Sequence, residues 1–358
     1  MPAWGLSRNG PRYLTTTREV APQDKRLSMP PPLSRRAFLK LSGAAALGLA
    51  LKRPPDDGDP PTPAAPMGLG RVTSAVRRRD QPSLSGKQLG IYYADALLNL
   101  YEALTDPADA SHNPIWFRTD DGWVHSSFVQ PVRNDLNAPV LDIPAEGFLA
   151  EVTVPGTEAW LNKKLAYRFY YSTTHWVDQG VTDEQGQVWY RVLDDRYRVF
   201  YYVLAEHLRR VPDEELTPLS PDVLDKRIEV DLAQQRLTAY ENGSRVFTAR
   251  LSSGRASFST PTGQFRIERK RPSRHMAAND GGGNGFDLPG IPWVAYFYWT
   301  GMAFHGTYWH NDYGRPRSRG CINLTPADAK WMYRWTMPVV PAGQAYVRDA
   351  RGTPVSVF

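Results

Sequence analysis

Short segments rich in aromatic and β-branched residues run from about residue 114 to residue 211, and turn signals separate them. These turn signals are Asp120-Asp121-Gly122, Pro155-Gly156 and Glu184-Gln185-Gly186. Segments of this composition form strands, and turns at such intervals leave no room for long helices. The pattern therefore predicts an all-β region, and it limits the fold of the chain more than any other feature.

Two stretches of this region echo each other. Each has a strand containing a tryptophan (Trp116 or Trp189), a polar turn, and then a short strand. The pattern is similar to that of bacterial SH3-like modules, so we predict one small SH3-like all-β domain here. Upstream, Ala96, Leu97, Leu100 and Leu104 have helical spacing and predict a short helix.

A second β region follows the break at residues 217–221. Ile228, Val230 and Leu232 alternate as in a strand, and the apolar runs on either side of Asn242-Gly243 predict a hairpin. The aromatic block of residues 293–299 predicts a further strand, preceded by a mobile glycine-rich loop between Arg274 and Gly285. Thr325-Pro326-Ala327-Asp328 has the capping residue, proline and acid that begin a helix.

Composition limits the classes of function. The 358 residues are 41% hydrophobic, which is enough for two modest cores, so one single domain is not expected. The net charge of +6 comes partly from the N-terminal third, and no signature of an RNA- or DNA-binding module accompanies it. We therefore expect no nucleic-acid partner.

The N-terminal region has the layout of a twin-arginine export signal. Arg35-Arg36 precede a moderately apolar run over residues 41–51, which is short for a spanning helix of about 20 residues. We therefore expect export through the twin-arginine pathway to the periplasm or cell wall. Neither Met1 nor Met29 is excluded as the start, and an uncleaved signal that anchors the protein in the membrane is equally open.

Cys321 is the only cysteine of the chain, so its role is packing, metal ligation or chemistry, and not an internal disulfide. It lies sixteen positions after His305. An imidazole can take the proton of a thiol and generate the nucleophile. Gly320 permits a tight turn in which the amides of Gly320 and Cys321 could hold an oxyanion.

A metal site is the rival interpretation, because His305, His310, Asp312 and Cys321 could be combined as ligands. The chain has no second cysteine and no His-Glu-x-x-His helix, so chemistry at the thiol is favoured. We interpret the remaining histidines as surface or structural residues; they are His112, His125, His175, His207 and His275.

From about Arg227 to Val347 the chain resembles the catalytic domain of the L,D-transpeptidases, whose motif is a His-Gly pair followed by Ser/Thr-His-Gly-Cys-x-Asn or Arg. The matching residues are His305, Gly306, Thr307, Ser318, Gly320, Cys321 and Asn323. Arg319 departs from the pattern, because the family most often has histidine there. Its guanidinium could pair with a substrate carboxylate or lower the pKa of the thiol.

The resemblance implies acyl transfer on peptidoglycan stem peptides by a mainly β protein with an L,D-transpeptidase-type β-sandwich and one or two short helices. Cys321 would be the nucleophile and His305 the general base and acid, with the Gly306 carbonyl orienting the imidazole and the Gly320 backbone in the oxyanion hole. The cleft would be shaped by Ser318, Arg319, Asn323, Tyr296, Tyr308 and Trp309. No metal or organic cofactor is implied.

The expected segments are an N-terminal extension with the export signal (1–55), a Pro-rich and basic linker (56–88), the SH3-like module (89–212), a second linker (213–225) and the catalytic domain (226–358). We expect a monomer that carbapenem-type β-lactams inhibit and whose β module could touch glycan strands. Two alternatives stay open. One is a carboxypeptidase that uses water as the acceptor, and the other is a non-catalytic wall-binding protein with a degenerate domain.

Overall fold

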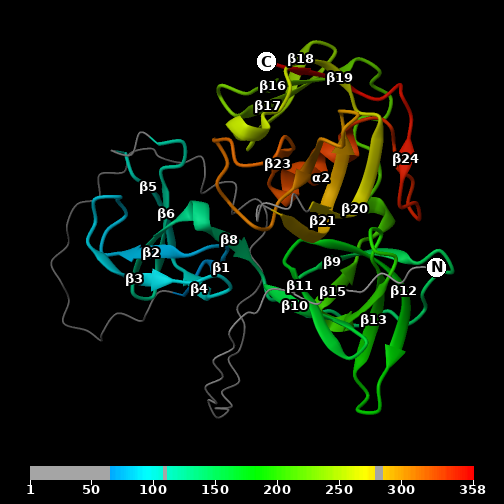
Figure 1. Cartoon of the computed structure of the whole chain (residues 1–358), viewed down its shortest axis with the longest axis horizontal. Helices are drawn as coiled ribbons and strands as arrows, with labels where there is room; N and C mark the ends of the chain where they lie inside the picture. Colours follow the sequence, from blue (N-terminus) through cyan, green and yellow to red (C-terminus); the bar gives the residue numbers. More distant parts are fainter. Residues whose placement is uncertain (1–64, 108–110, 279–284) are drawn as a thin grey trace, which may run out of the picture. The chain divides into compact units, whose positions relative to one another are not determined.

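Strands make up most of the regular structure in the computed structural model, which describes residues 65–107, 111–278 and 285–358 (Figure 1). Within these ranges the one α-helix is α2 (Pro326–Trp335), so the expected mainly β fold is confirmed there. The expected export signal and residues 279–284 of the expected loop lie outside the described residues.

The first group of eight strands forms two sheets that share a bent strand. It comprises β1 (Gly68–Val72), β2 (Val76–Arg79), β3 (Gln88–Tyr92), β4 (Leu97–Leu100), β5 (Glu102–Thr105), β6 (Ile115–Thr119), β7 (Gly122–His125) and β8 (Val129–Val132). The sheet orders are β4-β1-β8 and β3-β2-β7-β6-β5, and the 3₁₀ turn η1 (Ser126–Phe128) precedes β8. Only Tyr101 separates β4 from β5, so the two act as one bent strand that continues from one sheet into the other.

The second group of strands repeats the strand order of the first. It comprises β9 (Phe148–Val152), β10 (Gly156–Leu161), β11 (Lys164–Tyr170), β12 (Thr174–Thr182), β13 (Val188–Leu193), β14 (Phe200–Leu204), η2 (Ala205–His207) and β15 (Leu208–Arg210). Its sheet order is β11-β10-β14-β13-β12-β9-β15. With β4 and β5 taken as one strand equivalent to β12, the two groups have the same strand order. We call them the first copy (residues 65–132) and the second copy (residues 148–211).

Three expectations from the sequence need correction here. The stretch predicted as a linker over residues 56–88 contains β1 and β2 and ends at the first residue of β3, because its basic residues lie on two-faced strands and not on a solvated tail. The single module predicted over residues 89–212 is instead most of the first copy, which begins at residue 65, together with the whole second copy of the same topology. The helix predicted near residues 92–104 is the bent strand β4–β5, in which Leu98 and Leu100 are buried with the strand period of two. The SH3-like identity of either copy stays a prediction.

The last part of the chain packs two further five-stranded sheets together. One has the order β18-β17-β16-β25-β19 and the other β23-β22-β21-β20-β24. Their strands are β16 (Lys226–Asp231), β17 (Arg236–Glu241), β18 (Ser244–Arg250), β19 (Gly263–Arg266), β20 (Arg269–Ala278), β21 (Phe286–Tyr296), β22 (Ala303–Gly306), β23 (Ile322–Leu324), β24 (Val347–Arg348) and β25 (Pro354–Val357). The predicted Asn-Gly hairpin between β17 and β18 is confirmed, with φ of 47° at Asn242 and 80° at Gly243.

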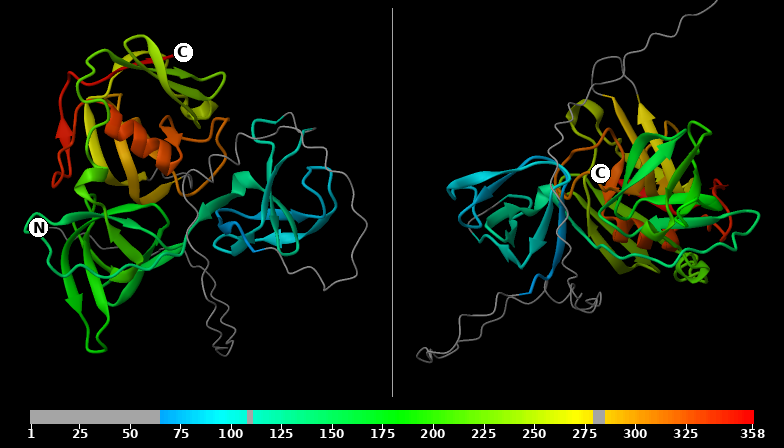
Figure 2. Two further views of the ribbon diagram at one scale, coloured as in Figure 1. Left: turned by 180° about the vertical axis from the view of Figure 1, so that it is seen from behind. Right: turned by 90° about the horizontal axis from the view of Figure 1, so that it is seen from below.

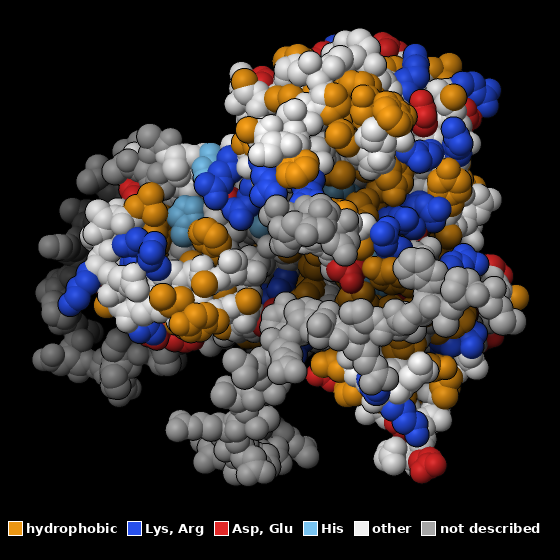
Figure 3. Space-filling view, viewed as in Figure 1, with side chains coloured by type: hydrophobic (Ala, Val, Ile, Leu, Met, Phe, Trp, Pro, Cys, Tyr) orange, Lys and Arg blue, Asp and Glu red, His pale blue; other side chains and the backbone are white. Residues whose placement is uncertain are grey.

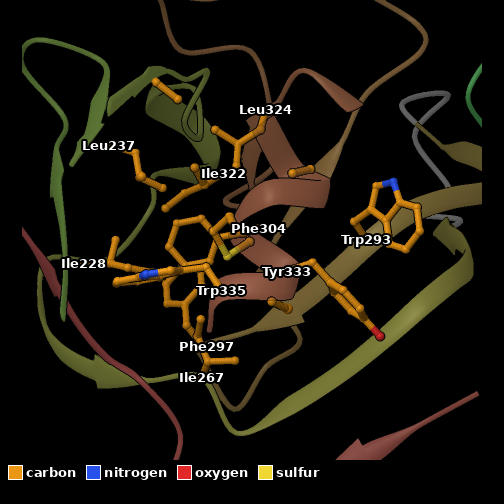
Figure 4. Packing of buried hydrophobic residues seen from close by; sticks show 14 of the residues in the cluster. Ile228, Leu237, Ile267, Trp293, Phe297, Phe304, Ile322, Leu324, Tyr333 and Trp335 are labelled. Atoms are coloured by element: carbon orange, nitrogen blue, oxygen red, sulfur yellow. The ribbon is translucent and has the colours of Figure 1, made fainter. Parts of the chain in front are cut away.

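Helix α2 lies between these two sheets (Figures 1 and 2). Trp331 stacks on Phe247 of β18 at 3.9 Å, and Tyr333 packs against Trp293 of β21. The close-up in Figure 4 shows Tyr333 with the other buried side chains that join the sheets. The predicted helix start is confirmed, because the Thr325 side chain accepts a hydrogen bond from Asp328 N at 3.1 Å.

The surface carries both kinds of charge. On the face that Figure 3 shows, Lys and Arg side chains are spread over several elements beside acidic and hydrophobic ones. No helix in the described ranges has the length and apolar character needed to cross a membrane.

Two buried lysines satisfy the carboxyl end of α2. Lys270 Nζ donates to the carbonyls of Tyr333 at 2.5 Å and Thr336 at 2.8 Å, and Lys226 Nζ donates to that of Trp335 at 3.0 Å. Burial lowers the pKa of Lys270 well below its usual range. The last carbonyls of a helix have no partners within the helix, so these amines complete its hydrogen bonding where no water reaches.

We predict that Lys270→Ala lowers the free energy of unfolding by about 3 kcal/mol, because it leaves two buried carbonyls without donors and removes a packed side chain. Urea unfolding followed by tryptophan fluorescence measures the change. Lys87→Ala on the surface is the control and should change stability by less than about 0.5 kcal/mol. An equal effect of both substitutions would contradict the capping role.

Candidate active site

The parallel pair of β22 and β23 brings the histidine and the cysteine together. In its register Phe304 faces Ile322 and His305 faces Asn323. Paired strands lie about 4.8 Å apart, and Cys321 immediately precedes β23, so its backbone lies beside that of β22. The loop of residues 307–321, which we call the connecting loop, joins the two strands.

The Cys321 thiol is partly exposed but lies in a poorly solvated place. Burial raises its pKa, and a backbone hydrogen bond from Ala303 opposes that shift. At neutral pH the group is therefore a protonated thiol. A base must remove its proton before the sulfur can attack a carbonyl.

His305 has the properties of such a base. Burial lowers its pKa to about 4, so its imidazole is neutral at pH 7. Nδ1 lies 3.0 Å from the carbonyl oxygen of Gly306. A carbonyl only accepts, so Nδ1 carries the hydrogen and Nε2 keeps a lone pair that can take a proton. The ring of Trp309 lies 5.8 Å from that of His305 and forms a wall beside it.

The turn before Cys321 is held by its own side chains. Ser318 Oγ accepts a hydrogen bond from Gly320 N at 3.1 Å and donates to the carbonyl of Cys321 at 2.5 Å. Gly320 has φ of 106°, and its carbonyl accepts from Thr260 Oγ1 at 3.0 Å. The Gly320 amide that the sequence suggested for an oxyanion hole is thus engaged inside the turn, and Ser318 forms this turn with both of its hydrogen-bonding functions.

The three aromatic residues expected in the cleft, Tyr296, Tyr308 and Trp309, differ in how they are placed relative to the thiol and the imidazole. Tyr308 is buried: its hydroxyl donates to the carbonyl of Pro289 at 3.0 Å, and its ring stacks on Tyr170 of the second copy. Tyr296 at the end of β21 is half-buried, and burial raises its pKa. Of the aromatic residues expected in the cleft, Trp309 is the one whose ring lies beside the imidazole of His305.

Arg319 lies between two aromatic rings. Its guanidinium carbon is 4.7 Å from the centre of the Phe258 ring and 5.6 Å from that of Phe286. Contacts of this kind hold an arginine by cation–π attraction while its donors stay in a plane. The side chain is half-buried next to the turn that carries the thiol.

His310 and Asn323 form a buried pair on the inner side of the connecting loop. Asp312 N donates to His310 Nδ1 at 3.2 Å, so Nε2 is the protonated nitrogen of this imidazole. The Asn323 amide nitrogen lies 3.1 Å from Nε2, and its oxygen has no partner. A half-turn of the amide presents its oxygen to Nε2–H and satisfies both groups.

The residues of the rival metal interpretation have other partners. Asp312 contacts Arg315, Arg317, His112 and Ser127, and His310 contacts Asn323. The described residues contain no group of three or more His, Cys, Asp or Glu side chains that could hold a metal ion.

Sequence reasoning missed several supports of the site. Thr260 links Gly254 N and the Gly320 carbonyl, and Met302 packs where a Cβ of Gly320 would lie. Thr260 begins the segment Thr260-Pro261-Thr262-Gly263, whose turn-forming residues were a usable signal. The sequence offered no signal for Met302, because its contact is made only in the folded chain.

Residues 225–357 match the YkuD family, the L,D-transpeptidase catalytic domain. The L,D-transpeptidase domain is thus found where the resemblance of the sequence placed it. Among curated relatives, YciB of Bacillus subtilis, which is named as a candidate L,D-transpeptidase, is 27% identical over 128 residues. The match covers 32% of this chain and 63% of YciB.

Several solved structures of L,D-transpeptidases are also similar to part of this chain. The L,D-transpeptidase of Enterococcus faecium, in its C442S mutant, is 27% identical over 38% of this chain and 51% of that chain, with a TM-score of 0.31. The catalytic domain of the E. faecium enzyme acylated by ertapenem is 28% identical over 37% of this chain and 97% of that chain, with a TM-score of 0.30. An L,D-transpeptidase from Mycobacterium smegmatis is 18% identical over 73% of this chain and 99% of that chain, with a TM-score of 0.31.

We predict that Gly320→Ala destabilises the protein by about 1–3 kcal/mol more than Gly301→Ala does. The two glycines have φ of 106° and 104°, so an added Cβ meets the same backbone strain at both. At Gly320 that Cβ would lie 2.7 Å from Met302 Cε, whereas at Gly301 it meets nothing within 4 Å. Urea unfolding of the two variants checks the difference, and equal losses would show that packing against Met302 contributes nothing.

Proposed function

We propose that this protein is a peptidoglycan L,D-transpeptidase whose nucleophile is Cys321. The carrying observation is the pairing of β22 with β23, which sets a neutral, oriented His305 beside the turn of the thiol. The L,D-transpeptidase domain at residues 225–357 supports the reaction class. The substrate, the acceptor and the residue roles that follow are part of the proposal.

In the first step Nε2 of His305 takes the thiol proton while the sulfur attacks the carbonyl of the third residue of a tetrapeptide stem. The tetrahedral intermediate collapses and the peptide bond to the terminal D-alanine breaks. His305 returns the proton to the leaving amine. The stem is then held on Cys321 as a thioester.

In the second step an amine attacks the thioester, and His305 again accepts and returns the proton. An amine from a neighbouring stem gives a cross-link, and one from a wall protein anchors that protein. Water in place of the amine would give a carboxypeptidase. Because the Gly320 amide is engaged by Ser318, we assign the oxyanion to the amide of Cys321 itself.

We assign Arg319 to a carboxylate of the stem peptide. Its guanidinium lies against the rings of Phe258 and Phe286, and the residue itself stands two positions before Cys321 in the same turn. A histidine at this place could lose its charge near neutral pH, whereas the guanidinium keeps it. Tyr296 and Trp309 would line the cleft around the stem.

A wall substrate requires the protein outside the cytoplasm, which agrees with the export signal expected at Arg35-Arg36. Those residues lie outside the described ranges. A single cysteine suits such a route, because the chain holds no second thiol to trap it in an internal disulfide. Contact of the β copies with glycan strands belongs to the same proposal.

A carbapenem tests the nucleophile. We expect ertapenem to add its full mass to the wild-type protein and none to Cys321→Ala, because ring opening by the sulfur loses no atoms. Intact-mass measurement reads the adduct, and circular dichroism shows that the variant is folded. An unmodified wild-type protein, or a modified Cys321→Ala, would exclude Cys321 as the acylated residue. Product analysis with a tetrapeptide and an added amine then separates transfer from hydrolysis.

The pH dependence of acylation follows from His305. Its folded pKa of about 4 means that the imidazole is neutral and able to accept a proton above that value. We expect the acylation rate to fall about tenfold per pH unit below pH 4 and to show no inflection near pH 6.5, the usual value for histidine. Stopped-flow acylation between pH 3 and 8, with the folded state checked at each pH, measures the profile.

A further inference from the structure

Asp312 is a fully buried carboxylate in the middle of the connecting loop. Its Oδ2 accepts from Arg315 Nε at 2.7 Å and from Arg317 of the same loop. Its Oδ1 accepts from Ser127 Oγ at 2.7 Å and lies 2.5 Å from His112 Nε2. A buried charge is tolerated only when such donors replace water, so all four groups help to keep it in place.

Two of these donors come from the first copy, far away in the sequence. His112 lies in the connection between β5 and β6, and Ser127 lies in η1. The neighbouring Asn311 adds two bonds to the same turn: its N donates to the Ser127 carbonyl at 3.1 Å and its Nδ2 to that of Ser126 at 3.2 Å. The described residues belong to one compact unit, and η1 is one of the places where the first copy contacts the connecting loop; Arg71 of β1, which donates to the Tyr308 carbonyl, is another.

Burial would raise the pKa of Asp312, but hydrogen bonds from His112, Ser127 and Arg317, together with the charge of Arg317, outweigh it. They hold that pKa well below its usual range. The carboxylate is therefore charged throughout the working range of the protein. Its bonds to the first copy are charge-assisted, which makes them stronger than bonds between neutral groups.

A continuous set of hydrogen bonds leads from Asp312 to the catalytic strands. The backbone N–H of Asp312 donates to His310, and His310 pairs with Asn323. Asn323 is the strand partner of His305 and lies two residues after Cys321. A shift of Asp312 would therefore move the residue that sets the spacing of the thiol and the imidazole.

The second copy shows which features of η1 are special. The equivalent turn, η2, has Ala205 and Glu206 where η1 has Ser126 and Ser127. Within the first copy both serine hydroxyls accept a hydrogen bond from Asn113 Nδ2, at 2.9 Å for Ser126 and 2.8 Å for Ser127. Ser127 Oγ in addition donates to Asp312 at 2.7 Å, so it joins the interior of the first copy to the connecting loop.

We propose that the first copy is a working part of the active site, with His112 and Ser127 as positioning residues that fix the thiol and the imidazole through Asp312, His310 and Asn323. The reaction in this proposal is the one given under the proposed function. The contacts that position the thiol and the imidazole do not depend on that function. It assigns to this β copy a task inside the protein, separate from any binding of the cell wall.

The test uses the full chain and the variants Ser127→Ala, His112→Ala and their combination. We expect each single change to lower the limiting rate of Cys321 acylation by ertapenem about tenfold. This is the rate factor that corresponds to the free energy of one hydrogen bond to a charged group. The half-saturating ertapenem concentration should change less than about twofold, because neither residue touches the inhibitor. Ser85→Ala, in an exposed connection of the same copy, is the matched control and should leave both constants unchanged.

Rescue separates positioning from mere stabilisation. His112→Gln keeps an N–H donor for Asp312 and should restore the rate to within about threefold of wild type, while His112→Ala does not. Thermal unfolding of every variant shows whether it is folded at the assay temperature. Folded variants with a wild-type limiting rate, or rates that fall only with the folded fraction, would overturn the proposal.

A second readout keeps the two proposals apart. Alkylation of Cys321 by iodoacetamide at pH 7 needs no recognition of a wall substrate, but it does need His305 to take the proton. We expect Ser127→Ala and His112→Ala to slow it several-fold, and Ser85→Ala to leave it unchanged. If ertapenem fails to react with the wild type, the proposed function fails, and alkylation alone then decides on positioning.

Discussion

The parallel pairing of β22 with β23 is the constraint on which the site depends. Side chains alternate along a strand, so Phe304, Ile322 and Leu324 enter the core while His305 and Asn323 lie on the opposite face. The core residues are fully buried and cannot shift without cost. The hydrophobic effect thus sets the position of the histidine, and the turn before Ile322 sets that of the thiol.

Burial has opposite effects on the pKa values of the proposed nucleophile, Cys321, and the proposed base, His305. It raises the pKa of Cys321 and lowers that of His305, so the resting pair is a neutral thiol and a neutral imidazole. In the proposed reaction, charge forms on this pair only when the proton moves from the thiol to the imidazole. Asp312 shows the contrasting case, because donors from two parts of the chain surround it and it stays charged inside the protein.

Local signals in the sequence were the dependable ones. Asn242-Gly243 and Thr325-Pro326-Ala327-Asp328 each specify a backbone conformation within four residues, and both predictions were confirmed. The helix predicted from Leu97, Leu100 and Leu104 was wrong, because helical spacing in a short apolar run also fits a bent strand. The sequence shows that the segments around Trp116 and Trp189 echo each other, but it does not show that each belongs to its own copy of one strand order.

By itself the sequence determined the mainly β fold, the start of α2 and the pairing of one cysteine with a His-Gly-Thr strand, because these depend on residue type and short spacing. Only the tertiary structure decided that Gly320 N is engaged by Ser318, that Tyr308 is buried, and that His112 and Ser127 reach the connecting loop. Those contacts join residues up to two hundred positions apart. The packing of the sheets determines which residues meet in these contacts, and a local sequence pattern contains no information about it.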